Sequence, residues 1–214
     1  ANLALFRLAA TWNADLVLTH HGLFWEVEDP AVNPAKPFDE RRARFLTEHG
    51  MSLAAYHLPL DAHPEVGNNA ALAHGLGLTY IAHDFGDLSG TEVKVGVSAR
   101  ADPPISVDEC FRRCERLCGQ PVRLTHGGPE LIETIGIISG GATSELYSAI
   151  DRGFDAFLTG EGREWAVAVA EEGGIHFLAA GHYATEVFGV RALGRWLTEN
   201  YGLETRYFAI PNPY

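Results

Sequence analysis

The chain has 214 residues, of which 46% are hydrophobic and 21% charged, enough for one or two domains with a buried core. Acidic residues outnumber basic ones by 28 to 16, giving a formal net charge of −12, which argues against nucleic acid as a partner because phosphate contacts need the opposite sign. The sequence offers neither an uncharged apolar run of roughly 18 to 20 residues nor a basic amphipathic stretch, so a membrane partner is also disfavoured.

Short apolar runs alternate with helical patterns along the chain. Strands are predicted at Asp15–His20, Met51–His57, Leu78–His83, Glu92–Ala99, Pro121–Thr125, Glu133–Ser139, Phe154–Thr159, Ile175–Ala180 and Glu204–Ile210. Helices are predicted at Leu3–Thr11, Phe38–His49, Pro64–Gly75, Val107–Cys118, Thr143–Asp151, Gly162–Glu171 and His182–Tyr201. This alternation predicts an α/β fold with largely parallel or mixed sheets in three α-β-α layers.

Nine strands are many for one open sheet, so we expect two α/β halves, residues 1–91 and 92–214, with the loop Asp84–Thr91 at the boundary. The chain opens at Ala1, without Met and inside a predicted helix. We therefore expect the native start to lie upstream.

The three cysteines, Cys110, Cys114 and Cys118, fall four residues apart in one predicted helix. Their Cβ atoms would be about 5–6 Å apart, whereas a disulfide needs about 3.8 Å. The spacing favours a buried helix stripe over an iron–sulfur site. Cysteine usage indicates a reducing, cytoplasmic compartment.

Metal-ligand types gather where three predicted strands end. His20 and His21 follow the first strand, Asp61 follows the second, and His182 and Glu186 lie four apart where the last helix begins. Ligands bind at the carboxyl ends of parallel strands, so all five could face one crevice. For each motif the alternative is a purely structural role: a polar turn for the histidines, a helix N-cap for Asp61, and a solvated helix face for the last pair.

A site of this composition suits two divalent ions with water completing the coordination. Imidazole and carboxylate without thiolate fit zinc, iron, manganese or nickel. Two ions bring four positive charges and the two carboxylates cancel two, so the site would attract hydroxide or a phosphate ester and suits metal-assisted hydrolysis. His57 and His63, which lie on either side of Asp61 in the sequence, are further imidazoles within reach of the site.

The chain resembles the Ngg-interacting factor three family, whose bacterial members are labelled GTP cyclohydrolase I type 2-like. The motifs that carry the resemblance span the chain in order: His20-His21-Gly22-Leu23-Phe24-Trp25, Tyr56–His63, Glu65-Val66-Gly67-Asn68-Asn69, Thr159-Gly160-Glu161, Gly181–Glu186 and Ile210–Pro213. The likeness is to the short bacterial form.

The resemblance implies a dinuclear metal site in a protein of two similar, intertwined halves that assembles as a ring-shaped homohexamer. Its ligand positions fall on His20, His21, Asp61, His182 and Glu186, with Glu186 as the bridging carboxylate. Glu161 is implied as a candidate proton-transfer residue. The label implies hydrolysis of GTP or a related nucleotide with release of formate, and the alternative is a metal-binding, metal-delivery or regulatory protein without turnover.

The segment Ser139-Gly140-Gly141-Ala142-Thr143 follows a predicted strand and opens a helix, a position where backbone N–H groups could hold a phosphate. It has neither the full glycine motif of dinucleotide sites nor the lysine of a P-loop. A tight turn is therefore the favoured interpretation.

Overall fold

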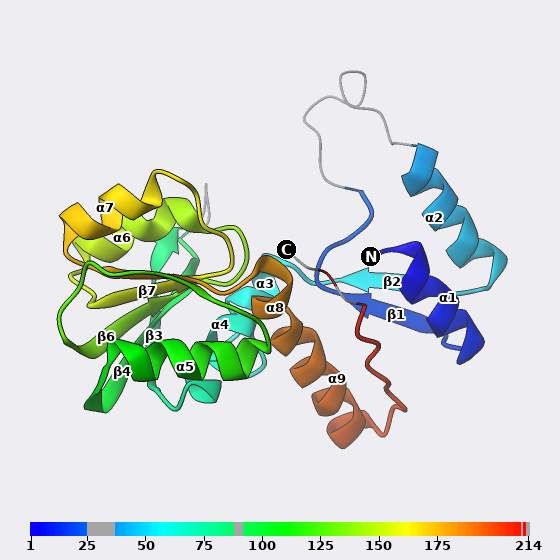
Figure 1. Cartoon of the computed structure of the whole chain (residues 1–214). Coiled ribbons are helices and arrows are strands. Elements are labelled where there is room, and N and C mark those ends of the chain that lie inside the picture. Colours follow the sequence, from blue (N-terminus) through cyan, green and yellow to red (C-terminus); the bar gives the residue numbers. More distant parts are fainter. Residues whose placement is uncertain (25–36, 88–91, 211, 213–214) are drawn as a thin grey trace. The chain divides into compact units, whose positions relative to one another are not determined.

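The computed structural model describes residues 1–24, 37–87, 92–210 and 212, and shows a mixed α/β fold (Figure 1). The chain divides into two compact units. Unit 1 comprises Ala1–His57 and Leu197–Pro211, and unit 2 comprises Leu58–Trp196 and Asn212–Tyr214. The predicted division of the chain into two α/β halves, residues 1–91 and 92–214, stays a prediction. No helix in the described ranges has both the length and the apolar character that a bilayer crossing needs.

Unit 1 is built on two parallel strands, β1 (Leu16–Thr19) and β2 (Ser52–Ala55), each preceded by a helix, α1 (Leu3–Thr11) and α2 (Pro37–Glu48). Its core is formed by Phe6, Ala9, Val17, Leu23, Leu46 and Met51. The parallel register pairs Thr19 with Ala55, so both strands end at the same edge.

Unit 2 contains a mixed six-stranded sheet with the strand order β3-β4-β6-β7-β8-β5. The strands are β3 (Thr79–Asp87), β4 (Lys94–Ser106), β5 (Arg123–Thr125), β6 (Leu131–Ile137), β7 (Ala156–Thr159) and β8 (His176–Ala179). The central strands β6, β7 and β8 are parallel, and the outer pairs are antiparallel. The carboxyl ends of the three parallel strands therefore share one edge.

Two helices of unit 2 precede its first strand, and the others follow strands of its sheet. They are α3 (Leu58–Asp61), α4 (Asn68–Gly75), α5 (Val107–Cys118), a 3₁₀ turn η1 (Thr143–Glu145) with α6 (Leu146–Asp151), α7 (Ala166–Gly173), α8 (His182–Thr185) and α9 (Val187–Tyr201). The last residues of α9, from Leu197, belong to unit 1.

Side chains along the central strands alternate between two apolar clusters. In β7, Ala156 and Leu158 pack with α4 and α5, whereas Phe157 packs with α6 and α7. Because successive strand residues point to opposite faces, the two clusters lie on opposite faces of the sheet. Figure 1 shows α5 on one side of this sheet and α6 and α7 on the other. Unit 2 is thus a three-layer α-β-α sandwich, in agreement with the predicted fold class.

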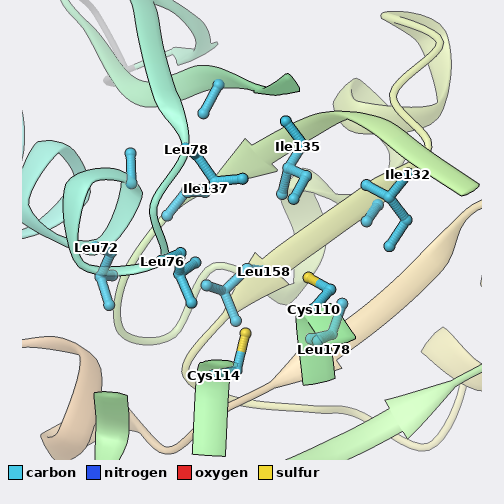
Figure 2. Close-up of a cluster of buried hydrophobic side chains, with 14 of the residues drawn as sticks. Leu72, Leu76, Leu78, Cys110, Cys114, Ile132, Ile135, Ile137, Leu158 and Leu178 are labelled. Carbon is cyan, nitrogen blue, oxygen red and sulfur yellow. The ribbon is translucent and has the colours of Figure 1, made fainter. Parts of the chain in front are cut away.

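The cysteine stripe of α5 lies in the first of these clusters. Cys110 and Cys114 are buried and point toward the leucine and isoleucine side chains of the sheet (Figure 2). All three cysteines are free thiols, as predicted. The helix begins as predicted too: Glu109 N donates to Ser106 Oγ at 3.2 Å, and Gly119 closes the helix in the left-handed region at φ 67°.

Several predicted element bounds are wrong. Glu204–Ile210 is no strand, because a strand needs a pairing partner and no ladder among the described residues includes it. The helix predicted from Pro64 begins only at Asn68, and the one predicted from Gly162 begins at Ala166. Residues 84–87 of the predicted boundary loop belong to β3, and its residues 88–91 lie outside the described part, as does the Trp25 of the first family motif.

Candidate metal centre

Three imidazoles gather at the strand ends of unit 1. His20 and His21 follow β1, and His57 lies two residues beyond β2. Their ring centroids are 4.8–5.0 Å apart in every pairing, and one ring nitrogen of each lies within 4.8 Å of one from the others. Because β1 and β2 are parallel and in register, the strands themselves bring these side chains together. Thr19 Oγ1 donates to the carbonyl of His21 at 2.9 Å and fixes the turn between the two adjacent histidines.

In unit 2, His182 stands between two carboxylates. Its Nε2 is 3.1 Å from Glu186 Oε1, four residues further along the chain, and its Nδ1 is 2.7 Å from Glu161 Oε1. The bond from Glu186, opposed by burial and supported by Glu161, raises the pKa of His182 to about 9. A helical turn that presents an imidazole nitrogen and a carboxylate oxygen side by side, with a second carboxylate behind the ring, is a common way to build a metal ligand pair.

Glycines at the ends of β6 and β7 make room for this pair. A Cβ on Gly140 would lie 2.2 Å from Glu186 Oε1 and 3.2 Å from His182 Nε2, and Gly140 has a φ of +69°. The carbonyl of Gly140 accepts bonds from the N–H groups of Gly160 and Glu161 at 2.9 and 3.0 Å. The N–H of Gly140 donates to Thr185 Oγ1 at 3.0 Å. The predicted tight turn after Ser139 is therefore packed directly against the segment that carries His182 and Glu186.

Asp61, the last residue of α3, is only 5% exposed. Its Oδ1 accepts a hydrogen bond from Asn68 Nδ2 at 2.8 Å and another from Ser139 Oγ at 3.0 Å. The alternative of an N-cap role does not apply, because Gly67 occupies the N-cap of α4. A buried carboxylate without such donors would be very costly, so the surrounding donors are what hold this aspartate in place.

The predicted site residues divide between the units. His20 and His21 belong to unit 1, and Asp61, Glu161, His182 and Glu186 to unit 2. Within unit 2, Glu161, His182 and Glu186 are brought into contact. His63 is a turn residue, since its Nδ1 accepts from the N–H groups of Glu65 and Val66, both at 3.2 Å.

Three residues of this region were not among the predicted ligands. His57 was named only as a further imidazole within reach, and its place beside His20 and His21 follows from the parallel pairing of β1 and β2. Asn68 and Ser139, which bond Asp61, lie 7 and 78 residues from it along the chain. Asn68 stands within a family motif, and that was the only indication available for it.

Comparison with known proteins places these observations in a family. A model of the Duf34/NIF3 (NGG1p interacting factor 3) family matches residues 1–213. Proteins named GTP cyclohydrolase 1 type 2 homolog from Pasteurella multocida and Escherichia coli (strain K12) are 41% and 39% identical over 214 and 222 aligned residues, covering 100% of this chain and 82% of each relative.

Solved structures agree with this assignment. Protein ybgI, described as of unknown function, has a TM-score of 0.88 at 37% identity, and TTHA1606 from Thermus thermophilus has 0.84 at 34%. In both cases the similarity covers 100% of this chain and 82% of the other. The match extends over both units and over every motif discussed above, and the chain belongs to the Duf34/NIF3 family.

Proposed function

We propose that this protein binds two divalent metal ions. The ligands we assign are His20, His21, Asp61, His182 and Glu186, with His57 as a further imidazole of the first group. The observation that carries the proposal is the contact of 3.1 Å between His182 Nε2 and Glu186 Oε1, with Glu161 Oε1 at 2.7 Å from the other ring nitrogen.

The chemistry of the donors fits such ions. Imidazole nitrogens and carboxylate oxygens suit zinc, iron, manganese or nickel. Glu161 faces Nδ1, and an ionised carboxylate only accepts hydrogen bonds, so Glu161 keeps the proton on Nδ1 and leaves Nε2 as the metal-binding nitrogen. Glycine at position 140 provides the space beside Glu186 Oε1 that any side chain would fill.

We further propose that the protein is a metal-dependent hydrolase acting on GTP or a related nucleotide. The name shared by the relatives supports this choice of substrate. Divalent ions bound at this site would supply Lewis-acid activation of water and of the substrate. Asp61 and Glu186 offset only two of the four positive charges, which favours an anionic substrate, and Glu161 is the candidate proton-transfer residue.

Metal content per chain tests the first proposal. We expect close to two ions by plasma mass spectrometry on protein purified without a histidine tag, and a clear loss in Asp61→Ala and His182→Ala. His126→Ala, which alters a histidine elsewhere in unit 2, should keep the parent's content. Absence of metal from the parent after reconstitution would refute the metal site.

Formate release from GTP tests the second. We expect release that depends on added metal and is lost in Glu186→Ala. Tight metal retention without turnover of any nucleotide would instead support the alternative of a metal-binding, metal-delivery or regulatory protein. We also propose a homohexamer, for which light scattering should give six times the mass of one chain.

A further inference from the structure

A buried polar network surrounds Asp61 inside unit 2. Its two donors, Asn68 and Ser139, are 0% and 6% exposed. Both donate to Oδ1, at 2.8 and 3.0 Å. Two donors on one oxygen fix the rotation of the carboxylate about its last bond, so the direction in which Oδ2 points is set by these neighbours.

Asn68 also reaches the backbone next to Glu186. Its Oδ1 accepts a hydrogen bond of 2.6 Å from the N–H of Gly189, three residues after Glu186. A Cβ on Gly189 would lie 3.0 Å from this oxygen and 2.9 Å from Leu60, so the approach depends on glycine. The amide group of Asn68 is planar and has different chemistry at its two ends. Its two bonds therefore fix both its orientation and the spacing of the groups that it joins.

We propose that Asn68 is a positioning residue, which sets the orientation of the Asp61 carboxylate relative to the chain segment that carries His182 and Glu186. The inference rests on the proposed metal site, since it supposes that Asp61 and Glu186 bind the same pair of ions. Partners behind metal ligands typically change metal affinity by about 10- to 100-fold when they are removed. Asn68 has the burial and the contacts of such a partner.

The chain offers a matched control in the next residue. Asn69 is the same residue type on the same helix and is also 0% exposed. Its Oδ1 accepts from Ser139 N and its Nδ2 donates to Val95 O, both at 2.7 Å. Asn68→Ala and Asn69→Ala thus remove the same group from the same buried layer, but only the first removes a direct donor to the Asp61 carboxylate, because Asn69 bonds the backbone N–H of Ser139 and not the hydroxyl that reaches Asp61.

Cobalt(II) is the probe, because calorimetry gives its affinity and its visible absorption reports the geometry of its ligands. We expect Asn68→Ala to bind cobalt about 10- to 100-fold more weakly, with a changed spectrum. Asn69→Ala should stay within about threefold of the parent and keep the parent's spectrum. If Asn68→Ala does not fold, Asn68→Leu keeps a similar volume and removes the amide donor without adding a charge, and the same loss is expected.

A double-mutant cycle separates positioning from general loosening of the fold. In an Asp61→Ala background, titrated with cobalt at concentrations high enough to load the weakened site, Asn68→Ala should cause no further loss, because the group through which Asn68 acts is absent. Equal losses in Asn68→Ala and Asn69→Ala, or a loss that persists without Asp61, would overturn the positioning role. Undiminished binding by Asn68→Ala would overturn that role alone, whereas a parent that binds no cobalt would overturn the metal site itself and the positioning role with it.

Discussion

The substitution Gly140→Ala tests the metal ligands independently of the stability of the fold. The new Cβ would lie 2.2 Å from Glu186 Oε1, and ordinary contact begins at 3.4 Å, so the carboxylate must move by about 1.2 Å. Glu186 Oε1 is the end of a flexible side chain, and this movement costs the fold little. A displacement of that size nevertheless takes the oxygen away from His182 Nε2, and we expect metal affinity to fall by on the order of 10- to 100-fold.

Gly153→Ala is the control for the backbone. Gly140 and Gly153 have φ values of +69° and +70°, but a Cβ on Gly153 meets nothing within 4 Å. Both substitutions place alanine in the left-handed region, which costs roughly 1–2 kcal/mol. Urea denaturation should therefore show similar losses of unfolding free energy, while cobalt titration should show a weakened site only in Gly140→Ala. Equal cobalt affinities in the two variants would refute the assignment of Glu186 as a ligand crowded by position 140.

Three more predictions concern the proton on His182, the role of Glu161 and the reactivity of Cys118. The two carboxylates beside His182 raise its pKa to about 9. In the metal-free chain at neutral pH this imidazole therefore carries a proton that a metal must displace. Cobalt affinity should rise with pH from 6 toward 9, and an affinity that does not change with pH in calorimetric titrations would contradict this. Glu161→Gln should weaken cobalt binding about 10- to 100-fold. Glu164→Gln, at an exposed position in the same loop, should leave cobalt binding unchanged. Equal cobalt affinities in the two variants would contradict the supporting role of Glu161 toward His182. Burial raises the pKa of Cys118 to about 11, so this thiol should resist a thiol reagent at pH 8 in the folded chain and react after unfolding in guanidinium, and rapid labelling of the native protein would count against its burial.

The fold was predictable where one local rule decides the structure. The helices Leu3–Thr11 and Val107–Cys118 have the predicted bounds, since a side chain caps the start of each. Eight of the nine predicted strands are present in the two sheets. Glu204–Ile210 has the apolar content of a strand, but strand formation depends on a neighbour, which no local pattern reveals.

The last predicted helix shows a second limit of local patterns. One continuous helix was predicted over His182–Tyr201, but the structure breaks it at Glu186, which has a φ of −106°. The break leaves the four-residue spacing of His182 and Glu186 intact. A helical period therefore predicted the right pair of residues even though the pair spans the junction of α8 and α9.

The candidate site was predictable as residue types at strand ends, and not as a network. Asn68, Ser139 and Asp61 are all buried, and burying three polar groups together is costly unless each is bonded. Ser139 reaches Asp61 across 78 residues of sequence, so only the fold can disclose this bond. Apolar residues of similar size would pack this region with less risk of an unsatisfied group. Two buried donors on one oxygen of Asp61 hold that carboxylate in a single orientation, which is what the proposed role as a metal ligand requires and a stable core does not.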